Sequence, residues 1–195
     1  MTRLVIADDH PAFVLGLRLS LAEAFEVVGT ALDGEELLKV VLDTKPDAII
    51  TDVRMPKLSG IDACLRLGSA LDDCAVVMLS TFNDPATIDA ARRAGARAFV
   101  SKETPVEELA VIVRRLVTDH ALDLVPPVSL PTLTPREHDV LMLVAQGCSN
   151  REIAQRLGIG LETVKDYCSS LYGKLDATDR LSAVSSARRL GLIDG

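Results

Sequence analysis

The sequence lacks the long apolar segments that would place the chain in a membrane or direct it out of the cell. No apolar run approaches the roughly 20 residues that a helix needs to cross a bilayer. The apolar run near the N-terminus is too short for a signal peptide and is interrupted by Asp8 and Asp9. Of the 195 residues, 48% are hydrophobic and 25% are charged, as in a globular protein with a buried core. We therefore expect a cytoplasmic chain with no membrane partner.

Paired cysteines are also missing from the sequence. The four cysteines are scattered and form no CxxC pair, so the sequence predicts neither a zinc site nor a disulfide framework. A free thiol in such a position is commonly a small apolar core residue. The side chains expected to be buried for this reason are Cys64, Cys74, Cys148 and Cys168.

Five short apolar runs recur in the first 118 residues. Each run is too short for a typical helix and is typical of a strand buried on both faces of a parallel sheet. Longer segments between the runs have apolar residues every three or four positions, which predicts amphipathic helices. The runs are at 4–8, 27–31, 48–52, 76–80 and 98–102. The alternation predicts an α/β fold with a (βα)5 doubly wound parallel sheet and helices on both of its faces.

Residues typical of helix N-termini occur at three further places. A Ser or Thr followed three residues later by Glu has the spacing of a capping box, and Pro is favoured at the first helical position. Asn is also a common N-cap residue. The predicted caps are Thr104 before Pro105 and Glu107, Thr134 before Pro135 and Glu137, and Asn150.

The sheet topology predicts where polar side chains meet. Ligands of open parallel sheets bind outside the carboxyl ends of the strands, and the residues at these ends are Asp8, Asp9, Asp52, Ser80 and Lys102. Three carboxylates in one crevice remain ionised at little cost only beside a cation. Oxygen ligands suit Mg²⁺, which keeps several waters and also binds phosphate oxygens. We therefore expect a phosphoryl site in which Asp52 is the nucleophile and Lys102 and Ser80 contact the phosphoryl oxygens.

Four motifs resemble the receiver domain of two-component response regulators, whose fold is flavodoxin-like. They are DDHP at 8–11, DVRMPKLSG at 52–60, LSTF at 79–82 and AFVSK at 98–102. The resemblance covers residues 1–118 and is specific, because the motifs fall in the same order and spacing as in the family. It implies that a partner histidine kinase phosphorylates Asp52.

The same resemblance implies a role for each residue at a motif position. The metal ligands for Mg²⁺ are Asp8, Asp9, Asp52 and the backbone carbonyl of Arg54. The residues implied to respond to phosphorylation are the switch hydroxyl of Ser80, the switch aromatic Phe99 and the phosphate-binding Lys102.

A proline-rich segment separates this region from a second domain. Prolines at 126, 127 and 131 disfavour regular structure and predict a short, semi-extended linker over 119–131. Helical patterns resume at 134–147 and continue at 150–158, 161–175 and 179–190. The glycine-containing turn at 158–160 predicts a helix-turn-helix. We therefore expect an all-α domain of four helices over 132–195.

The second domain resembles the LuxR-type DNA-binding domain of the NarL/FixJ response regulators, on the segment that begins LTPREHDVLMLVAQGCSNREIAQRLGIG and continues through the third helix. The resemblance implies a transcriptional regulator that binds promoter DNA, dimerises when phosphorylated and places its third helix in the major groove. The candidate DNA-contacting residues are Arg151, Lys165, Asp166, Ser169, Lys174 and Arg180.

The charge of the second domain leaves an alternative open. Residues 132–195 contain eight basic and eight acidic residues, so the basic footprint of a strong nucleic-acid binder is missing. The predicted outer face of the third helix carries two acids and one lysine, namely Glu162, Asp166 and Lys165. The alternative function is a receiver-controlled adaptor whose helix-turn-helix binds protein.

An enzymatic alternative is disfavoured by one residue. A phosphohydrolase with an aspartyl nucleophile commonly needs a second acid two residues further on to protonate the leaving group. That position is occupied by Arg54. We therefore expect no enzyme activity beyond Mg²⁺-dependent self-phosphorylation from a donor and self-dephosphorylation.

Overall fold

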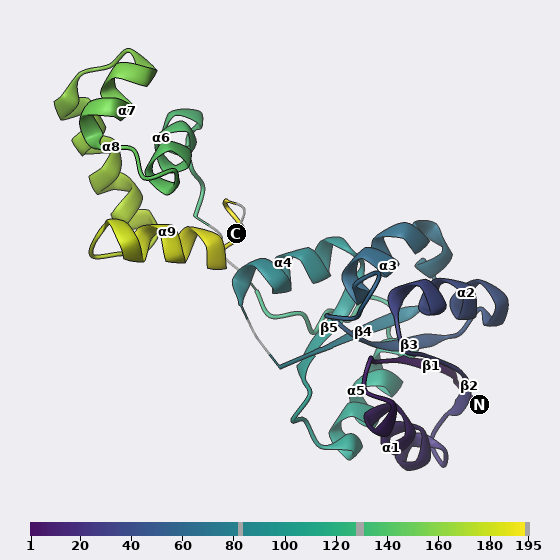
Figure 1. Ribbon diagram of the computed structural model, residues 1–195. Coiled ribbons are helices and arrows are strands. Elements are labelled where there is room, and N and C mark those ends of the chain that lie inside the picture. The colour runs from purple at the N-terminus through teal and green to yellow at the C-terminus, as the bar shows by residue number, and fades with distance from the viewer. Residues whose placement is uncertain (82–83, 128–130, 194–195) are drawn as a thin grey trace. The chain divides into compact units, whose positions relative to one another are not determined.

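The structure is a computed structural model that describes residues 1–81, 84–127 and 131–193 (Figure 1). Position 82 of the LSTF motif and positions 128–130 of the predicted linker lie outside the described residues. The chain forms two compact units, one built largely from the residues up to 127 and the other from those after 131. None of the helices in the described ranges is long and apolar enough to cross a membrane.

The first unit is a five-stranded parallel sheet with the strand order β2-β1-β3-β4-β5. The strands are β1 (Arg3–Ala7), β2 (Glu26–Ala31), β3 (Ala48–Asp52), β4 (Ala75–Ser80) and β5 (Ala96–Ser101). The helices are α1 (Pro11–Leu21), α2 (Gly34–Thr44), α3 (Gly60–Leu67), α4 (Pro85–Arg93) and α5 (Val106–Thr118), and a 3-10 helix η1 (Gly68–Leu71) follows α3. The predicted doubly wound α/β fold is confirmed.

Two apolar cores lie on opposite faces of this sheet. Helices α1 and α5 cover one face, and α2, α3 and α4 cover the other (Figure 1). The central strands β1, β3 and β4 are buried on both faces, as their continuous apolar sequences predict. The same expectation is wrong for β2, whose residues from Glu26 to Thr30 are exposed or half-buried, because β2 is an edge strand.

Residues 119–127, predicted as part of the linker, pack on the other edge of the sheet. The amide of Leu124 donates to the carbonyl of Arg97 at 2.7 Å, and Leu124 forms a parallel bridge with Ala98 of β5. Val125 is buried in the core on the α4 face. The Arg92 guanidinium binds the carboxylate of Asp123 and the carbonyl of Val125. This segment therefore covers the open edge of β5.

The second unit contains the four predicted helices. They are α6 (Pro135–Ala145), α7 (Asn150–Leu157), α8 (Leu161–Lys174) and α9 (Arg180–Arg189), and they enclose one apolar core. The four cysteines of the chain are buried and unpaired, which confirms their prediction as core residues.

The predicted helix caps are only partly correct. Thr134 and Glu137 form the expected capping box at the start of α6. At α5, Pro105 itself is the N-cap residue with an extended ψ of 141°, so the helix begins one residue later and no side chain caps it. At α7, Ser149 is the cap and forms a box with Glu152, whereas Asn150 is already helical. The Ser149 box satisfies two backbone amides, which a cap at Asn150 does not do.

Candidate functional site

An acidic crevice lies at the carboxyl ends of the parallel strands. Asp8 follows β1, Asp52 ends β3, and Lys102 follows β5. The Nζ atom of Lys102 lies 2.7 Å from Oδ2 of Asp52 and 2.7 Å from Oδ2 of Asp8. Asp8 and Asp52 are only 1% and 6% exposed, respectively. The structure therefore brings together the three charged groups that the sequence placed at successive strand ends.

The crevice has more buried negative charge than Lys102 neutralises. Burial raises the pKa of Asp52, and the charge of Asp8 acts in the same direction, while the Lys102 ammonium and the Arg54 backbone amide partly oppose the rise. Burial acts to lower the pKa of Lys102, but its bonds to Asp52 and Asp8 outweigh that effect and raise it. Two carboxylates thus share one ammonium in a place with little access to water.

One oxygen of the buried Asp8 carboxylate is incompletely satisfied. Its buried Oδ2 contacts Lys102 but accepts no hydrogen bond of normal geometry from any described residue. The Lys102 ammonium is shared with Asp52, so it satisfies this oxygen only in part, and a buried oxygen in that state is costly. Oxygen donors of this kind are the ligands that Mg²⁺ prefers. The residues at this site therefore fit a hard divalent cation.

Asp9 and His10 form the exposed rim beside Asp8. The Nδ1 atom of His10 lies 3.0 Å from Oδ1 of Asp8 and 2.8 Å from Oδ1 of Asp9. The hydrogen bond to Asp8 is the main cause of a raised His10 pKa, and the charge of Asp9 adds to it. Ligand atoms of all three residues lie within 4.8 Å of one another. From the sequence, we expect His10 to be a loop residue and not a ligand. The sequence feature that indicates its contact with the two aspartates is its position directly after Asp8 and Asp9.

The other residues implied by the receiver motifs lie around the same crevice. Ser80 ends β4 and is buried, and its carbonyl accepts a hydrogen bond from the Lys102 amide at 3.0 Å. Phe99 is 7% exposed and lies in the core on the α4 face. Arg54 is exposed, and its amide is bonded to the Asp52 carboxylate. The metal-ligand role of the Arg54 carbonyl remains a prediction.

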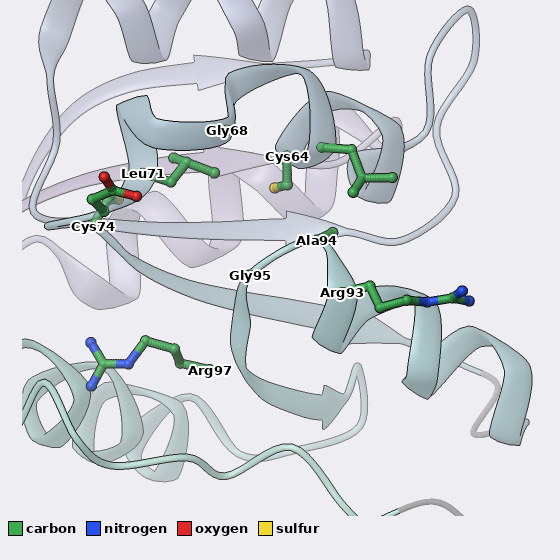
Figure 2. Close-up of a pocket in the computed structure, with 10 residues that line it drawn as sticks. Cys64, Gly68, Leu71, Cys74, Arg93, Ala94, Gly95 and Arg97 are labelled. Carbon is green, nitrogen blue, oxygen red and sulfur yellow. The ribbon is translucent and has the colours of Figure 1, made fainter. Parts of the chain in front are cut away.

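A separate hollow lies away from this crevice. It has a volume of about 330 Å³ and is lined by α3, η1 and the turn between α4 and β5. Figure 2 shows that the side chains of Arg93 and Arg97 extend in opposite directions. Arg93 pairs with Asp89, and Arg97 donates to the carbonyls of Asp119 and Leu122. Both guanidinium groups are therefore engaged elsewhere and do not form an anion site in this hollow.

Helix α8 of the second unit has the two faces that its sequence predicts. Val164, Cys168 and Leu171 are buried in the core. Lys165, Asp166 and Ser169 are exposed. Lys165 Nζ lies 2.7 Å from Oε1 of Glu162 one turn earlier, and both side chains are more than half exposed. The outer face is thus accessible to a partner and carries little net charge.

Two of the candidate DNA-contacting cations have partners inside the domain. Lys174 Nζ donates to Oε2 of Glu137 at 2.7 Å and to the carbonyl of Thr132 at 3.0 Å. Arg180 donates to the carbonyls of Val144 and Cys148 at 3.0 and 2.5 Å. Both cations tie helices of the domain together. Arg151 and Lys165 are exposed and are not tied to another described helix, whereas the exposed Lys174 is held by Glu137.

Comparisons with known families match both units of the chain. Residues 4–114 match the family described as "Response regulator receiver domain", and residues 131–187 match "Bacterial regulatory proteins, luxR family". Together the two matches span almost the whole chain. They confirm the two resemblances that the sequence motifs indicated.

Individual relatives align over nearly the full length of the chain. The Bacillus subtilis (strain 168) "Uncharacterized transcriptional regulatory protein YhcZ" is 36% identical over 208 aligned residues, which cover 97% of each chain. The transcriptional regulatory protein DesR of the same organism is 33% identical and is covered to 98%, as is this chain. A solved structure of the Salmonella typhimurium RcsB response regulator, described in terms of conformational dynamism for DNA interaction, has a TM-score of 0.86 at 25% identity, with 95% of this chain and 98% of that chain covered.

Proposed function

The chain belongs to the response regulators that carry a receiver domain and a LuxR-type DNA-binding domain, and we propose that phosphorylation of Asp52 by a histidine kinase controls its binding to promoter DNA. The observation that carries this proposal is the contact of Lys102 with both Asp8 and Asp52 in the buried crevice. A carboxylate that shares one cation with another carboxylate is poised to accept a divalent ion and a phosphoryl group.

The residues of the crevice have distinct roles in the proposed phosphoryl transfer. An oxygen of Asp52 attacks the phosphorus of a phosphohistidine, the new O–P bond forms as the N–P bond breaks, and the histidine nitrogen keeps the electron pair and takes up a proton. Asp8, Asp9, Asp52 and the Arg54 carbonyl would hold Mg²⁺, which supplies charge neutralisation for the phosphoryl oxygens when bound. Lys102 neutralises a second part of that charge.

The proposed switch begins with the release of Lys102 from its present contacts. The new phosphoryl oxygens offer Lys102 better partners than the shared carboxylates do, and they can also accept a hydrogen bond from the Ser80 hydroxyl. Phe99 is already packed inward in this structure, and we propose that phosphorylation favours this packing and biases the surfaces that control dimerisation. A bias of about 1.4 kcal/mol changes the equilibrium tenfold.

We propose a smaller set of DNA-contacting residues than the six candidates predicted from the sequence. Arg151, Lys165, Asp166 and Ser169 are exposed and form this set. Lys174 and Arg180 are left out because they bind Glu137 and backbone carbonyls. Two cations per chain make few phosphate contacts. A dimer on DNA would double their number.

The relatives favour DNA over protein as the partner of the second unit. The similar RcsB response regulator is described as interacting with DNA, and the two Bacillus subtilis relatives are described as transcriptional regulatory proteins. These descriptions support a promoter-binding regulator rather than a protein-binding adaptor. A DNA-binding regulator of this kind acts in the cytoplasm.

Intact-mass measurement tests the phosphorylation step. The full chain is incubated with acetyl phosphate and Mg²⁺, and a single added phosphoryl group is expected in the wild type and absent in Asp52→Asn, because an amide is a poor nucleophile. Asp62→Asn is the matched control, since Asp62 lies on α3 in an exposed contact with Ser59. A stable phosphoryl group on Asp52→Asn would contradict the assignment. DNA affinity before and after phosphorylation then tests the output.

A further inference from the structure

The loop between β3 and α3, residues 53–59, contains a lysine in an unfavourable backbone conformation. Lys57 has a φ of +60°, in the left-handed region that residues with a Cβ rarely adopt. Its Nζ atom lies 2.6 Å from Oδ2 of Asp33, at the start of α2. An ion pair therefore holds the loop at the position where its backbone is least favourable.

Asp33 is a firm anchor for this pair. Its side chain is 6% exposed, whereas that of Lys57 is 59% exposed. Oδ1 accepts a hydrogen bond from the Glu36 amide at 2.9 Å and so caps α2, which leaves Oδ2 for Lys57. The hydrogen bond from Lys57 is also the main cause of a lowered Asp33 pKa. The carboxylate is thus fixed by the Glu36 amide of the helix as well as by the lysine.

Two close backbone contacts hold the same loop beside the crevice. The Gly34 amide donates to the Leu58 carbonyl at 3.0 Å, and a Cβ at Gly34 would lie 2.2 Å from that oxygen. The Gly60 amide donates to the Val53 carbonyl at 3.1 Å, and a Cβ at Gly60 would lie 2.0 Å from the Asp52 carbonyl oxygen. The loop is therefore held at both ends, and the ion pair lies between these contacts.

We propose that Asp33 and Lys57 form a positioning pair for the phosphoacceptor. The pair fixes the loop that carries Arg54, whose amide is bonded to the Asp52 carboxylate. In this way it keeps that carboxylate oriented and the Arg54 carbonyl available for Mg²⁺. The inference rests on the proposed phosphorylation of Asp52. It adds two residues that act through the loop, namely Asp33 outside the receiver motifs and Lys57 within DVRMPKLSG, to which the resemblance gives no role.

Two substitutions of Lys57 separate positioning from mere stabilisation. Lys57→Ala removes the ion pair and keeps a Cβ in the left-handed backbone. Lys57→Gly removes the ion pair but relieves the backbone strain, because glycine adopts a positive φ freely. If the pair positions the loop, both variants are slow to accept the phosphoryl group, although the glycine variant is the more stable of the two. If the pair only stabilises the fold, the rate follows stability and the glycine variant recovers.

The matched control is Lys45, which has a φ of +45° at the other end of α2. Its ammonium makes no ion pair with any described residue. Lys45→Ala therefore removes a left-handed lysine without touching the loop beside Asp52. Lys57→Arg keeps the positive charge and serves as the conservative rescue.

Two measurements are made on the full-length variants. The initial rate of phosphorylation by acetyl phosphate is followed by intact mass over a Mg²⁺ series, and Mg²⁺ binding without the donor is measured by calorimetry. We expect Lys57→Ala and Lys57→Gly to lose about threefold or more in rate, because small misplacements of reacting groups are costly, and to bind Mg²⁺ more weakly. Lys45→Ala and Lys57→Arg should match the wild type in both.

The outcomes distinguish this inference from the proposed function. If the wild type is phosphorylated on Asp52 and Lys57→Gly retains both its rate and its Mg²⁺ affinity, the positioning role is wrong while the proposed function stands. If the wild type takes up no phosphoryl group, the proposed function fails. In that case Mg²⁺ affinity still decides whether the pair positions the metal site, since an unchanged affinity in Lys57→Gly would overturn that role too.

Discussion

Each unit of the molecule buries a carboxylate against a lysine, but the pKa values of the two carboxylates are shifted in opposite directions. In the first unit, burial raises the pKa of Asp52 above its usual range, although Lys102 lies 2.7 Å away. In the second unit, Glu137 is also buried, yet its pKa is lowered to about 2, first by the hydrogen bond from Lys174. Contact with a lysine alone therefore does not determine the state of a buried acid.

The difference comes from burial, which has the largest effect on the pKa of Asp52, and from the number of donors available to each carboxylate. Oε2 of Glu137 accepts from Lys174 and from the Thr134 amide, both at 2.7 Å, and Oε1 accepts from the Ser170 hydroxyl at 2.7 Å. Asp52 shares its lysine with Asp8, whose Oδ2 accepts no hydrogen bond of normal geometry from the described residues. A fully bonded carboxylate stabilises a fold, whereas an incompletely neutralised one can accept a cation and a phosphoryl group.

The largest effect is expected from removing the shared cation. Lys102→Met leaves Asp8 and Asp52 buried without an ammonium, and loss of one partner from a buried pair costs about 3 kcal/mol or more. Mg²⁺ should restore much of this loss, because a ligand at 100 times its Kd stabilises by about 2.7 kcal/mol. Urea unfolding followed by far-UV circular dichroism, with Mg²⁺ or with EDTA, measures both effects.

Lys174→Met is the counterpart of this variant in the second unit. Both tyrosines of the chain, Tyr167 and Tyr172, lie in the second unit, and the chain has no tryptophan. Tyrosine fluorescence therefore follows the unfolding of that unit within the full chain. Lys174→Met should destabilise the second unit, and Mg²⁺ should not restore it. Restoration of both variants by Mg²⁺, or of neither, would contradict the distinction between the two carboxylates.

Replacing a buried acid by its amide, which removes the charge and keeps the shape, should change the stability of the two units in opposite directions. Asp8→Asn removes one of the two charges that share Lys102, so without Mg²⁺ we expect the first unit to gain about 1 kcal/mol. Glu137→Gln weakens hydrogen bonds from Lys174 and the Thr134 amide, so the second unit should lose about 1–3 kcal/mol. Asp8→Asn should also lose most of the stabilisation by Mg²⁺. The same unfolding curves provide the test, and a loss of stability in both variants would disprove the opposite signs.

The second unit should also show a defined loss of stability in acid. The folded pKa of Glu137 is about 2 and its ordinary value is 4.5, so the unfolded chain binds the proton more readily than the folded chain. The stabilisation by this group is therefore complete above about pH 4.5 and is lost as the pH falls toward 2. Tyrosine-detected urea unfolding between pH 6 and 3 measures the slope. Glu137→Gln is the control and should show a smaller slope over this range.

Much of the first unit could be predicted because its pattern repeats. Five apolar runs gave the strands to within two residues at each end, and the strand-end rule placed Asp8, Asp52 and Lys102 in one crevice. The exposure of β2 could not be predicted, since edge and central strands have similar local sequences and differ only in strand order. The packing of residues 119–127 could not be predicted either. Their prolines indicate a linker, and their partners Arg92 and Arg97 lie on other elements of the chain.

The second unit shows why charged residues are harder to assign than apolar ones. The predicted outer face of α8 is exposed, and Val164, Cys168 and Leu171 on its other face are buried. The sequence predicts Lys174 and Arg180 as DNA contacts, and in the structure their long side chains reach partners 37 and 36 residues away in the sequence. A helical period predicts the face on which a side chain starts and not where its charged end lies. Only the folded structure shows that Glu137 and Val144 are within reach.

The smallest expected effects concern the exposed surface of α8, where we compare Lys165, a proposed DNA contact, with Lys174, which is bound inside the domain. Lys165 pairs only with the exposed Glu162 among the described residues, a contact worth little. Lys165→Ala should therefore weaken DNA binding and reduce the slope of log K against log salt by about 0.9, the value for one phosphate contact. Asp166→Asn should strengthen non-specific binding, since an exposed acid near phosphates repels DNA. Lys174→Met is the control and should keep the wild-type slope under conditions where it remains folded, because its ammonium binds Glu137. Fluorescence anisotropy with a labelled duplex over a salt series measures all three, and equal slopes for Lys165→Ala and the wild type would show that this face of α8 does not meet the DNA backbone.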